Sequence, residues 1–436
     1  MTASRSLFTR AALTLGSCLI LACGSSSPTT QGSGGTSSSG GATSSGGTTS
    51  TGGATSTGGS STGGASSSGG SSTGGAVGSG GATSTGGSAA GGKGGSSGGA
   101  GKGGSASGTG GGNGGATSPG GEPPSCAAGG PGLNTCGPNG NESCCTSLPV
   151  MGGMYNRTWT NNGSGATNQS APATVSAFKL DKYETTVGRF RQYVNYLANG
   201  GMPPAAGSGK HTHLNDGKGL ADSGKSGSFE QGWSSSWNQY VPTTAAAWTK
   251  NLTANMYGTW TATAGANELL PLTCISWYEA HAFCIWDGGF LPSEAEWKYA
   301  AGGGDEQRMY PWGSADPGTD SQYAIFDCLY PSKMKGMCTG VVNVPKVGST
   351  PKGIGRWGQY DLAGSDWEWN LDIYGTYVTP CTDCALLTGG TQRVLPGGGF
   401  HTPLNPDLLS SNRMSVMYDM TYRGDYGVGV RCARAP

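Results

Sequence analysis

Three segments of the chain carry the signals of helices. Over 184–199, apolar residues recur every three to four positions and a pair of glycines follows, which predicts a helix capped by Thr185 or Thr186. Two more helices are predicted by capping boxes, in which a serine is followed three residues later by a glutamate, at Ser276 and Ser293. Each of these two helices should end at a run of glycines.

The remainder of the folded part alternates short β-like runs with Gly, Pro, Asn and Asp, and it contains many aromatic residues. Such punctuation predicts turns and short strands rather than long ones. The expected fold class is therefore α+β with low regular secondary structure.

The first 22 residues have a different pattern. Arg5 and Arg10 precede a short apolar run that ends at Cys23, which is typical of a signal peptide rather than of a spanning helix. Small and aliphatic residues directly before Cys23 match the bacterial lipobox, which implies cleavage of residues 1–22 and lipidation of Cys23. Lipidation at Cys18 and a plain cleaved secretory signal are the alternatives. No aspartate follows Cys23, so we expect an exported, membrane-anchored lipoprotein at the outer membrane or cell surface.

Glycine contributes 85 of the 436 residues, and it is densest before residue 125. Residues 23–125 consist almost entirely of Gly, Ser, Thr and Ala, so they cannot bury enough apolar surface to fold. A flexible chain of about 100 residues spans roughly 55 Å root-mean-square. This segment is therefore predicted to be a disordered, low-complexity tether.

The charge balance argues against one class of partner. The chain has 25 basic and 25 acidic residues, and its formal net charge is zero. No basic stretch with interleaved aromatic residues occurs, so nucleic acid is not an expected partner.

Four cysteines crowd into the segment 126–150 among Gly, Asn and Pro. In an exported protein this cluster predicts a loop-rich segment held by two disulfides, which four cysteines can form in three ways. A zinc site is the alternative, although two adjacent cysteines are poorly spaced for tetrahedral ligands. The main domain is then expected to occupy 151–436. The four cysteines are Cys126, Cys136, Cys144 and Cys145.

Several blocks of this domain resemble the formylglycine-generating enzyme, or sulfatase-modifying factor, family. They occur in family order over about 260 residues and are strong only together. The resemblance implies a compact, aromatic-rich fold related to C-type lectins. The blocks are 178–190 (FKLDKYETTVGRF), 275–284 (ISWYEAHAFC), 291–297 (LPSEAEW), 310–313 (YPWG), 361–369 (DLAGSDWEW), 393–400 (RVLPGGGF) and 429–434 (GVRCAR).

The departures from this family concern its catalytic loop. Active members are expected to have a serine and two cysteines there, and the cysteines bind copper and oxidise a substrate cysteine to formylglycine. This chain has Gly399, Thr402 and Asp407 at those positions. Oxygen ligands do not suit Cu(I), which thiolates select, so we expect no copper and assign no catalytic residue.

The resemblance also implies a calcium site at the Trp-Glu-Trp block. Carried over position by position, the ligands are the side chains of Asp361 and Glu368 and the carbonyl groups of Gly364 and Asp366. Carboxylates, carbonyls and water can together supply the six to eight oxygens that calcium takes. A solvated turn between two core tryptophans is the alternative.

Other candidate chemistry is weaker. His211, His213 and Asp216 are the residue types of a two-histidine, one-carboxylate iron site, but their Gly- and Lys-rich surroundings favour solvated histidines in a surface loop. The long insert between the first two helices contains four tryptophans, which either line a ligand site or belong to the core. These are Trp233, Trp237, Trp248 and Trp260.

The cysteine of the central helix and that of the terminal block correspond to a disulfide pair of the family, so the resemblance implies a bridge between Cys284 and Cys432. Cys328 with Cys338, and Cys381 with Cys384, are further candidate pairs. Cys274 would then be the free thiol.

Two functions remain. The first is a surface-anchored, non-catalytic binding or display domain whose ligand is a peptide, a glycan or a protein. The second is an oxidoreductase of the formylglycine-generating type that modifies a protein cysteine, or a related non-haem metal enzyme. The missing catalytic cysteines favour the first.

Overall fold

The computed structural model describes residues 121–403, 406–414, 421–424 and 427–436. The expected signal peptide, the lipidation residue Cys23 and nearly all of the predicted tether lie outside the described residues. Within the described part, no helix is both long and apolar enough to cross a membrane.

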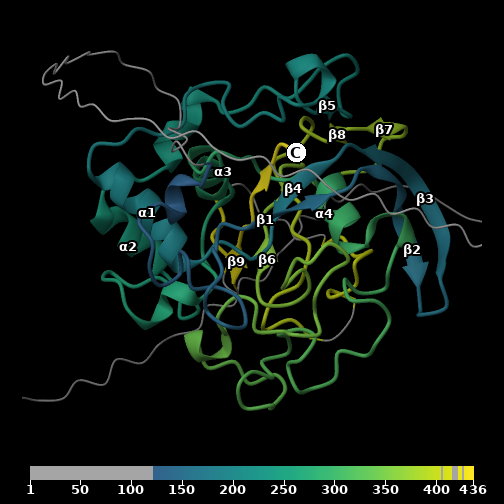
Figure 1. The fold of residues 1–436 in the computed structure, drawn as a ribbon. Coiled ribbons are helices and arrows are strands. Elements are labelled where there is room, and N and C mark those ends of the chain that lie inside the picture. The colour runs from purple at the N-terminus through teal and green to yellow at the C-terminus, as the bar shows by residue number, and fades with distance from the viewer. Residues whose placement is uncertain (1–120, 404–405, 415–420, 425–426) are drawn as a thin grey trace, which may run out of the picture. The chain divides into compact units, whose positions relative to one another are not determined.

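The described residues combine α-helices with short strands (Figure 1), as the sequence predicted for an α+β fold of low regular secondary structure. The helices are α1 (Val187–Ala198), α2 (Ala245–Leu252), α3 (Trp277–Trp286) and α4 (Glu294–Ala301). The strands are β1 (Ser147–Val150), β2 (Gly153–Asn161), β3 (Ala166–Val175), β4 (Phe178–Asp181), β5 (Ala221–Asp222), β6 (Trp367–Glu368), β7 (Cys381–Thr382), β8 (Cys384–Ala385), β9 (Val428–Gly429) and β10 (Ala433–Arg434).

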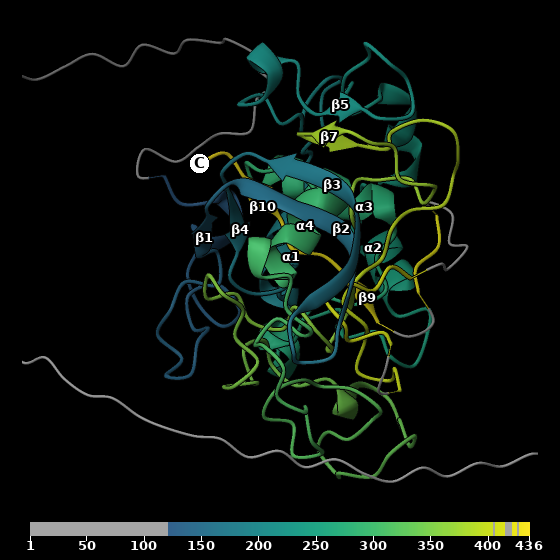
Figure 2. The same ribbon diagram turned by 90° about the vertical axis from the view of Figure 1, so that its right-hand side faces the viewer.

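Strand pairing brings the two ends of the domain together. β4 is the central strand of a three-stranded sheet, with β1 and β10 antiparallel on either side of it. A second sheet has the order β2–β3–β7, and Figure 2 shows its long hairpin passing across α4. The segment 126–150 is thus continuous with the domain, because its last residues form β1.

The helix starts follow from their caps, and this part of the prediction is confirmed. Thr186 caps α1 by accepting a hydrogen bond from the Arg189 backbone N–H. Ser276 and Ser293 each form a full capping box with the glutamate three residues later. Capping satisfies backbone donors that the first helical turn otherwise leaves unpaired.

Two elements were not predicted. The hairpin of β2 and β3 is longer than the short β-like runs expected, and α2 lies in the insert between α1 and α3. Thr244 caps α2 through a hydrogen bond from the Ala247 N–H. Trp248 and Leu252 of α2 are fully buried, so its packing rather than a strong sequence period accounts for the helix.

A buried network of four charges joins α1, the end of α3 and the central sheet. Arg189 donates to Asp181 at 2.9 Å and to Asp287 at 2.6 Å, and none of these three side chains is exposed. Arg434 contacts the same two carboxylates at 3.3 Å and 2.8 Å. Burial raises the pKa of Asp181, but Arg434 and Arg189 lower it further, so its pKa lies below the ordinary value.

Five disulfides stabilise the described residues. Cys284 is bonded to Cys432, as the family resemblance implied, and the two local pairs suggested for the later cysteines are also present. The cysteine-rich segment has two bridges, which selects one of the three open connectivities and leaves no thiolate there for zinc. Disulfides in this number are typical of a protein that matures in an oxidising compartment outside the cytoplasm. The bridges are Cys126–Cys145, Cys136–Cys144, Cys284–Cys432, Cys328–Cys338 and Cys381–Cys384.

Candidate functional site

The loop that corresponds to the family's catalytic loop is fixed by its own backbone. The Phe400 N–H donates to the Ser365 carbonyl at 2.7 Å, and the Cys328 N–H donates to the Phe400 carbonyl at 2.8 Å. The Thr402 N–H donates to the Gly399 carbonyl at 2.9 Å, while the Thr402 hydroxyl accepts from the Gly399 N–H at 2.8 Å. Gly399 and Thr402 therefore close a small buried turn on each other.

The packing around this turn leaves little room for a side chain at Gly399. A Cβ atom at Gly399 would lie 3.0 Å from Trp367 Cδ1 and 3.2 Å from the ring of His401, so a serine does not fit without a shift of these neighbours. Asp407 accepts a hydrogen bond from the Asn412 amide at 3.0 Å. All three vacated positions thus have structural contacts of their own.

One cysteine in the described residues is not in a disulfide. It is Cys274, as the pairing of the other cysteines predicted; its side chain is fully buried, and its thiol lies 3.2 Å from the Asn255 side-chain oxygen. Burial raises the pKa of the Cys274 thiol to about 11. Because the thiolate is the nucleophile and metal ligand, this residue offers almost none at neutral pH.

The Trp-Glu-Trp block is buried, so its interpretation as a solvated turn is wrong. Asp361 accepts from the Gly348 N–H at 2.6 Å and from the Thr350 hydroxyl at 2.8 Å. Glu368 is held by the guanidinium of Arg431, whose shortest contact is 2.7 Å. Both side chains predicted to bind calcium therefore already accept hydrogen bonds from the protein.

Asp366 lies in the same block and is unlike its neighbours. Its side chain is fully buried, and neither carboxylate oxygen has a hydrogen-bond partner among the described residues. Glu184 lies beside it and accepts from the Asp366 N–H at 3.0 Å. Burial and the neighbouring carboxylates raise the pKa of Asp366 and of Glu184 well above the ordinary values.

These contacts define an acidic cluster of Glu184, Asp361, Asp366 and Glu368, with Arg431 as its basic member. The donor chemistry fits a hard cation, because every free lone pair belongs to oxygen and the negative charge exceeds the positive. The geometry is less decisive, because the described residues contain no group of three or more His, Cys, Asp or Glu arranged to hold a metal ion. Glu184 and Arg431 were not identified as members from the sequence.

The histidine pair does not form the iron site considered from the sequence, nor is it solvated. His211 is fully buried; its Nδ1 lies 3.0 Å from Glu230 and its Nε2 lies 3.1 Å from Glu296. His213 stacks on Phe290. The expectation of solvated histidines is therefore wrong for His211, because two carboxylates distant in sequence neutralise its charge.

His211 is protonated in this arrangement. Burial alone would lower its pKa, but Glu230 and Glu296 raise it, and the result is about 10. Both partners are hydrogen-bond acceptors, so both ring nitrogens must carry hydrogens. Glu296 is also the glutamate of the α4 capping box, so this ion triad ties the insert to the start of that helix.

The four tryptophans of the insert divide into two groups. Trp233, Trp248 and Trp260 belong to the core, in which Trp248 packs edge-to-face on Phe190 at 5.2 Å. Trp237 is only half-buried. The interpretation as core therefore holds for three of them, and Trp237 remains available to a ligand.

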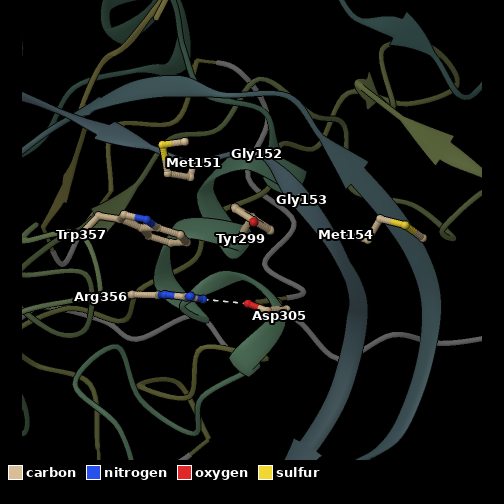
Figure 3. Close-up of a pocket in the computed structure, with 8 residues that line it drawn as sticks. All are labelled: Met151, Gly152, Gly153, Met154, Tyr299, Asp305, Arg356 and Trp357. Atoms are coloured by element: carbon tan, nitrogen blue, oxygen red, sulfur yellow. Dashed lines mark hydrogen bonds and ion pairs between the residues drawn. The ribbon is translucent and has the colours of Figure 1, made fainter. Parts of the chain in front are cut away.

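A surface groove of about 450 Å³ lies between the start of β2 and the loop after α4 (Figure 3). Tyr299 and Trp357 are stacked at 5.4 Å and form one part of it. A Cβ atom at Gly153 would lie 2.4 Å from the Tyr299 hydroxyl, so only glycine leaves this side of the groove open.

Exposed methionines form part of the rim of the groove. Met151 is 65% exposed and Met154 is 67% exposed, although both are large hydrophobic residues. Two charged residues line the groove, Arg356 and Asp305, and they neutralise each other in an ion pair of 2.7 Å. Exposed thioethers beside a tryptophan, a tyrosine and an arginine are a composition enriched in protein interfaces.

Residues 134–436 match the family described as sulfatase-modifying factor enzyme 1-like domain. The formylglycine-generating enzyme of Mus musculus is 32% identical over 133 residues, which are 30% of this chain and 35% of that protein. The inactive C-alpha-formylglycine-generating enzyme 2 of Mus musculus is 34% identical over 105 residues, 24% of this chain and 33% of that protein. These alignments span about a third of each relative. The solved structure of PvdO from Pseudomonas aeruginosa is 17% identical with a TM-score of 0.42, over 71% of this chain and 100% of that one.

The ion triad predicts a loss of stability at alkaline pH. The folded pKa of His211, about 10, exceeds its ordinary value of 6.5, so its contribution is complete below that value and disappears as the pH rises through 10. We expect the free energy of unfolding in urea to fall over this range. His211→Gln should be about 3 kcal/mol less stable at pH 7 and should show a flatter pH profile.

His213→Gln is the matched control. His213 stacks on Phe290, and among the described residues neither of its ring nitrogens has a carboxylate as a hydrogen-bond partner. The variant should retain the wild-type pH profile. A wild-type free energy of unfolding that stays constant between pH 6.5 and 10 would show that His211 is not held as an imidazolium.

Proposed function

The chain belongs to the sulfatase-modifying factor enzyme 1-like family, and we propose that it is a non-catalytic, ligand-binding member of that family. The observation that carries this proposal is the state of its thiols. Ten cysteines of the described domain form disulfides, and the remaining one, Cys274, is buried with a raised pKa. A reaction that depends on accessible thiolates and Cu(I) has no ligands here.

The vacated loop supports the same conclusion. The Thr402 hydroxyl accepts a hydrogen bond from the Gly399 N–H, and a Cβ atom at Gly399 would lie only 3.0 Å from Trp367, so a side chain there requires Trp367 to shift. One relative bears the name of an inactive formylglycine-generating enzyme, so the absence of activity has a parallel among similar proteins. An oxidoreductase acting on a protein cysteine remains the competing proposal.

The groove of Figure 3 supports a binding role. It is open to solvent, its charges are paired within the protein, and exposed methionines border it. A peptide or protein ligand would gain apolar contact there without having to neutralise a charge.

We further propose that Cys23 is lipidated and that the segment after it separates the domain from a membrane. The apolar run and small residues before Cys23 support this, as does the oxidising compartment that the disulfides indicate. The proposed location is the outer membrane or the cell surface.

The first prediction concerns activity. With Cu(I) supplied, the purified wild-type protein should form no aldehyde on a Cys-x-Pro-x-Arg peptide, as measured by mass spectrometry. The variant Thr402→Cys/Asp407→Cys should bind Cu(I) more tightly than wild type, because two thiolates replace oxygen ligands. Cys274→Ser is the control and should change neither result. Copper-dependent aldehyde formation by the wild type would refute the non-catalytic proposal.

The second prediction concerns calcium, which we propose is bound at the acidic cluster. An ion that binds only the folded state adds about 2.7 kcal/mol at a hundredfold excess over its Kd. A chelator should therefore lower the melting temperature of the wild type by several degrees, and Asp361→Ala should abolish this sensitivity. Asp305→Ala, at an exposed carboxylate, should retain it. A melting temperature indifferent to the chelator would mean that protons, rather than calcium, neutralise the cluster.

The third prediction concerns the anchor. Growth with a palmitate analogue should label the full-length protein, and Cys23→Ala should abolish the label, whereas Cys18→Ala should retain it. A label that persists in Cys23→Ala would place the lipid elsewhere, and a wild-type protein without label would exclude the lipoprotein.

A further inference from the structure

A second cavity, of about 200 Å³, lies under the insert between α1 and α3. Phe229, Glu230 and Trp237 of the insert form one side of it, and Trp277 and His281 of α3 form another. Leu371, Leu387 and Arg393 close it from the C-terminal half of the domain. The exposed residues Gln231 and Thr388 also line the cavity, so it is accessible from solvent.

Two buried side chains in this cavity have polar atoms without partners. Among the described residues, neither ring nitrogen of His281 accepts or donates a hydrogen bond, although the side chain is fully buried. Glu230 uses Oε2 for His211 and the Leu220 N–H, but its Oε1 has no partner. An unpaired buried polar atom costs about 1–3 kcal/mol, so both groups call for a hydrogen-bonding occupant.

The charged groups around the cavity have contacts within the protein. Glu230 is paired with the protonated His211 at 3.0 Å. Asp222 accepts from two backbone N–H groups and from the Thr388 hydroxyl. Arg393 lies 3.9 Å from the centre of the Trp277 ring. A charged ligand would have to compete with these contacts, whereas a neutral ligand leaves them in place.

The state of His281 agrees with a neutral ligand. Burial lowers the pKa of this imidazole to about 3, so the ring is uncharged at physiological pH. A neutral imidazole presents one donor and one acceptor. His281 and Oε1 of Glu230 together offer one donor and two acceptors beside the aromatic residues of the cavity.

The aromatic residues of the cavity include two with indole rings. Trp237 and Trp277 meet edge-to-face at 5.4 Å with an angle of 83° between their planes. An aromatic face gains from apolar contact, which an ion or a water cluster cannot supply. The cavity is also smaller than the roughly 300–1,000 Å³ of pockets for drug-sized ligands, which limits the occupant to one small ring.

We propose that this cavity binds one neutral pyranose residue of a glycan. A pyranose has an apolar C–H face that can lie on an indole, and hydroxyl groups at its edge that both donate and accept hydrogen bonds. A purely apolar ligand would leave His281 and Glu230 unpaired. The proposal rests on the binding function proposed above and names its ligand class and its site, which is separate from the groove of Figure 3.

The test is a titration of the purified full-length protein with neutral sugars at millimolar concentration. The probes are the methyl glycosides of glucose, galactose, mannose and N-acetylglucosamine, with glucuronate and glucosamine as charged comparisons. Indole fluorescence or calorimetry gives the dissociation constant. We expect saturable binding of at least one neutral glycoside and no binding of the charged probes.

Substitutions separate this cavity from other sites. Trp237→Ala should weaken binding at least tenfold and leave the fold intact, because Trp237 is only half-buried. His281→Phe should also weaken binding, because it removes the ring nitrogens. Trp357→Ala, in the other groove, is the matched control and should bind as wild type.

Failure of every neutral glycoside to bind would overturn this proposal, as would unchanged affinity in Trp237→Ala or preferential binding of a charged probe. These outcomes leave the proposed function standing, because it depends on the absence of formylglycine formation. Copper-dependent aldehyde formation would instead refute the proposed function, whatever the result with sugars.

Discussion

A buried network of two guanidinium groups and two carboxylates, in which the positive and negative charges balance, fixes the relative positions of several elements of the domain. Asp181 ends β4, Arg189 lies in the first turns of α1, Asp287 caps α3 and Arg434 lies in β10. In a dry interior, any one of these charges left unpaired would destabilise the fold by several kcal/mol. The network therefore allows a single arrangement of these elements, even though few of the residues belong to extended sheets.

A disulfide joins two of the elements that this ion network connects. Cys284 lies three residues before Asp287 in sequence, and Cys432 lies two residues before Arg434. The bridge Cys284–Cys432 and the ion pair of Asp287 with Arg434 thus join the same two elements, α3 and β10. Between these links and β9 lies Arg431, which holds Glu368. The framework therefore helps to position the acidic cluster through Arg431, and none of these links involves the three vacated catalytic positions.

Local signals predicted the parts of the structure that depend on neighbours in sequence. The caps at Thr186, Ser276 and Ser293 are satisfied within three residues, and the helices begin where the caps placed them. The resemblance to a known family supplied the bridge between Cys284 and Cys432, which local pattern alone could not. The hairpin of β2 and β3 was missed because most of β3 is exposed and polar, so it lacks the alternation of a half-buried strand.

The surroundings of the candidate sites depend on partners that are remote in sequence, and there local reasoning about solvent exposure was wrong. His211 was assigned to a solvated loop because its neighbours are Gly and Lys, yet the carboxylates that bury it lie 19 and 85 residues away. The side chain of Asp366, for which a solvated turn was the alternative interpretation, is enclosed beside Glu184, 182 residues away. No spacing rule connects such pairs, because burial and charge compensation are decided by the assembled fold.

The buried Cys274 has a consequence for the life of the protein outside the cytoplasm. A domain with ten bonded cysteines and one unbonded thiol is exposed to disulfide scrambling, since exchange begins with attack by a thiolate. With a pKa of about 11, only about one Cys274 side chain in ten thousand is ionised at pH 7, and the side chain is shielded from solvent. Once folded, copies of the domain would therefore not become cross-linked through this residue. The native bridges are thereby preserved by kinetics as well as by their own stability.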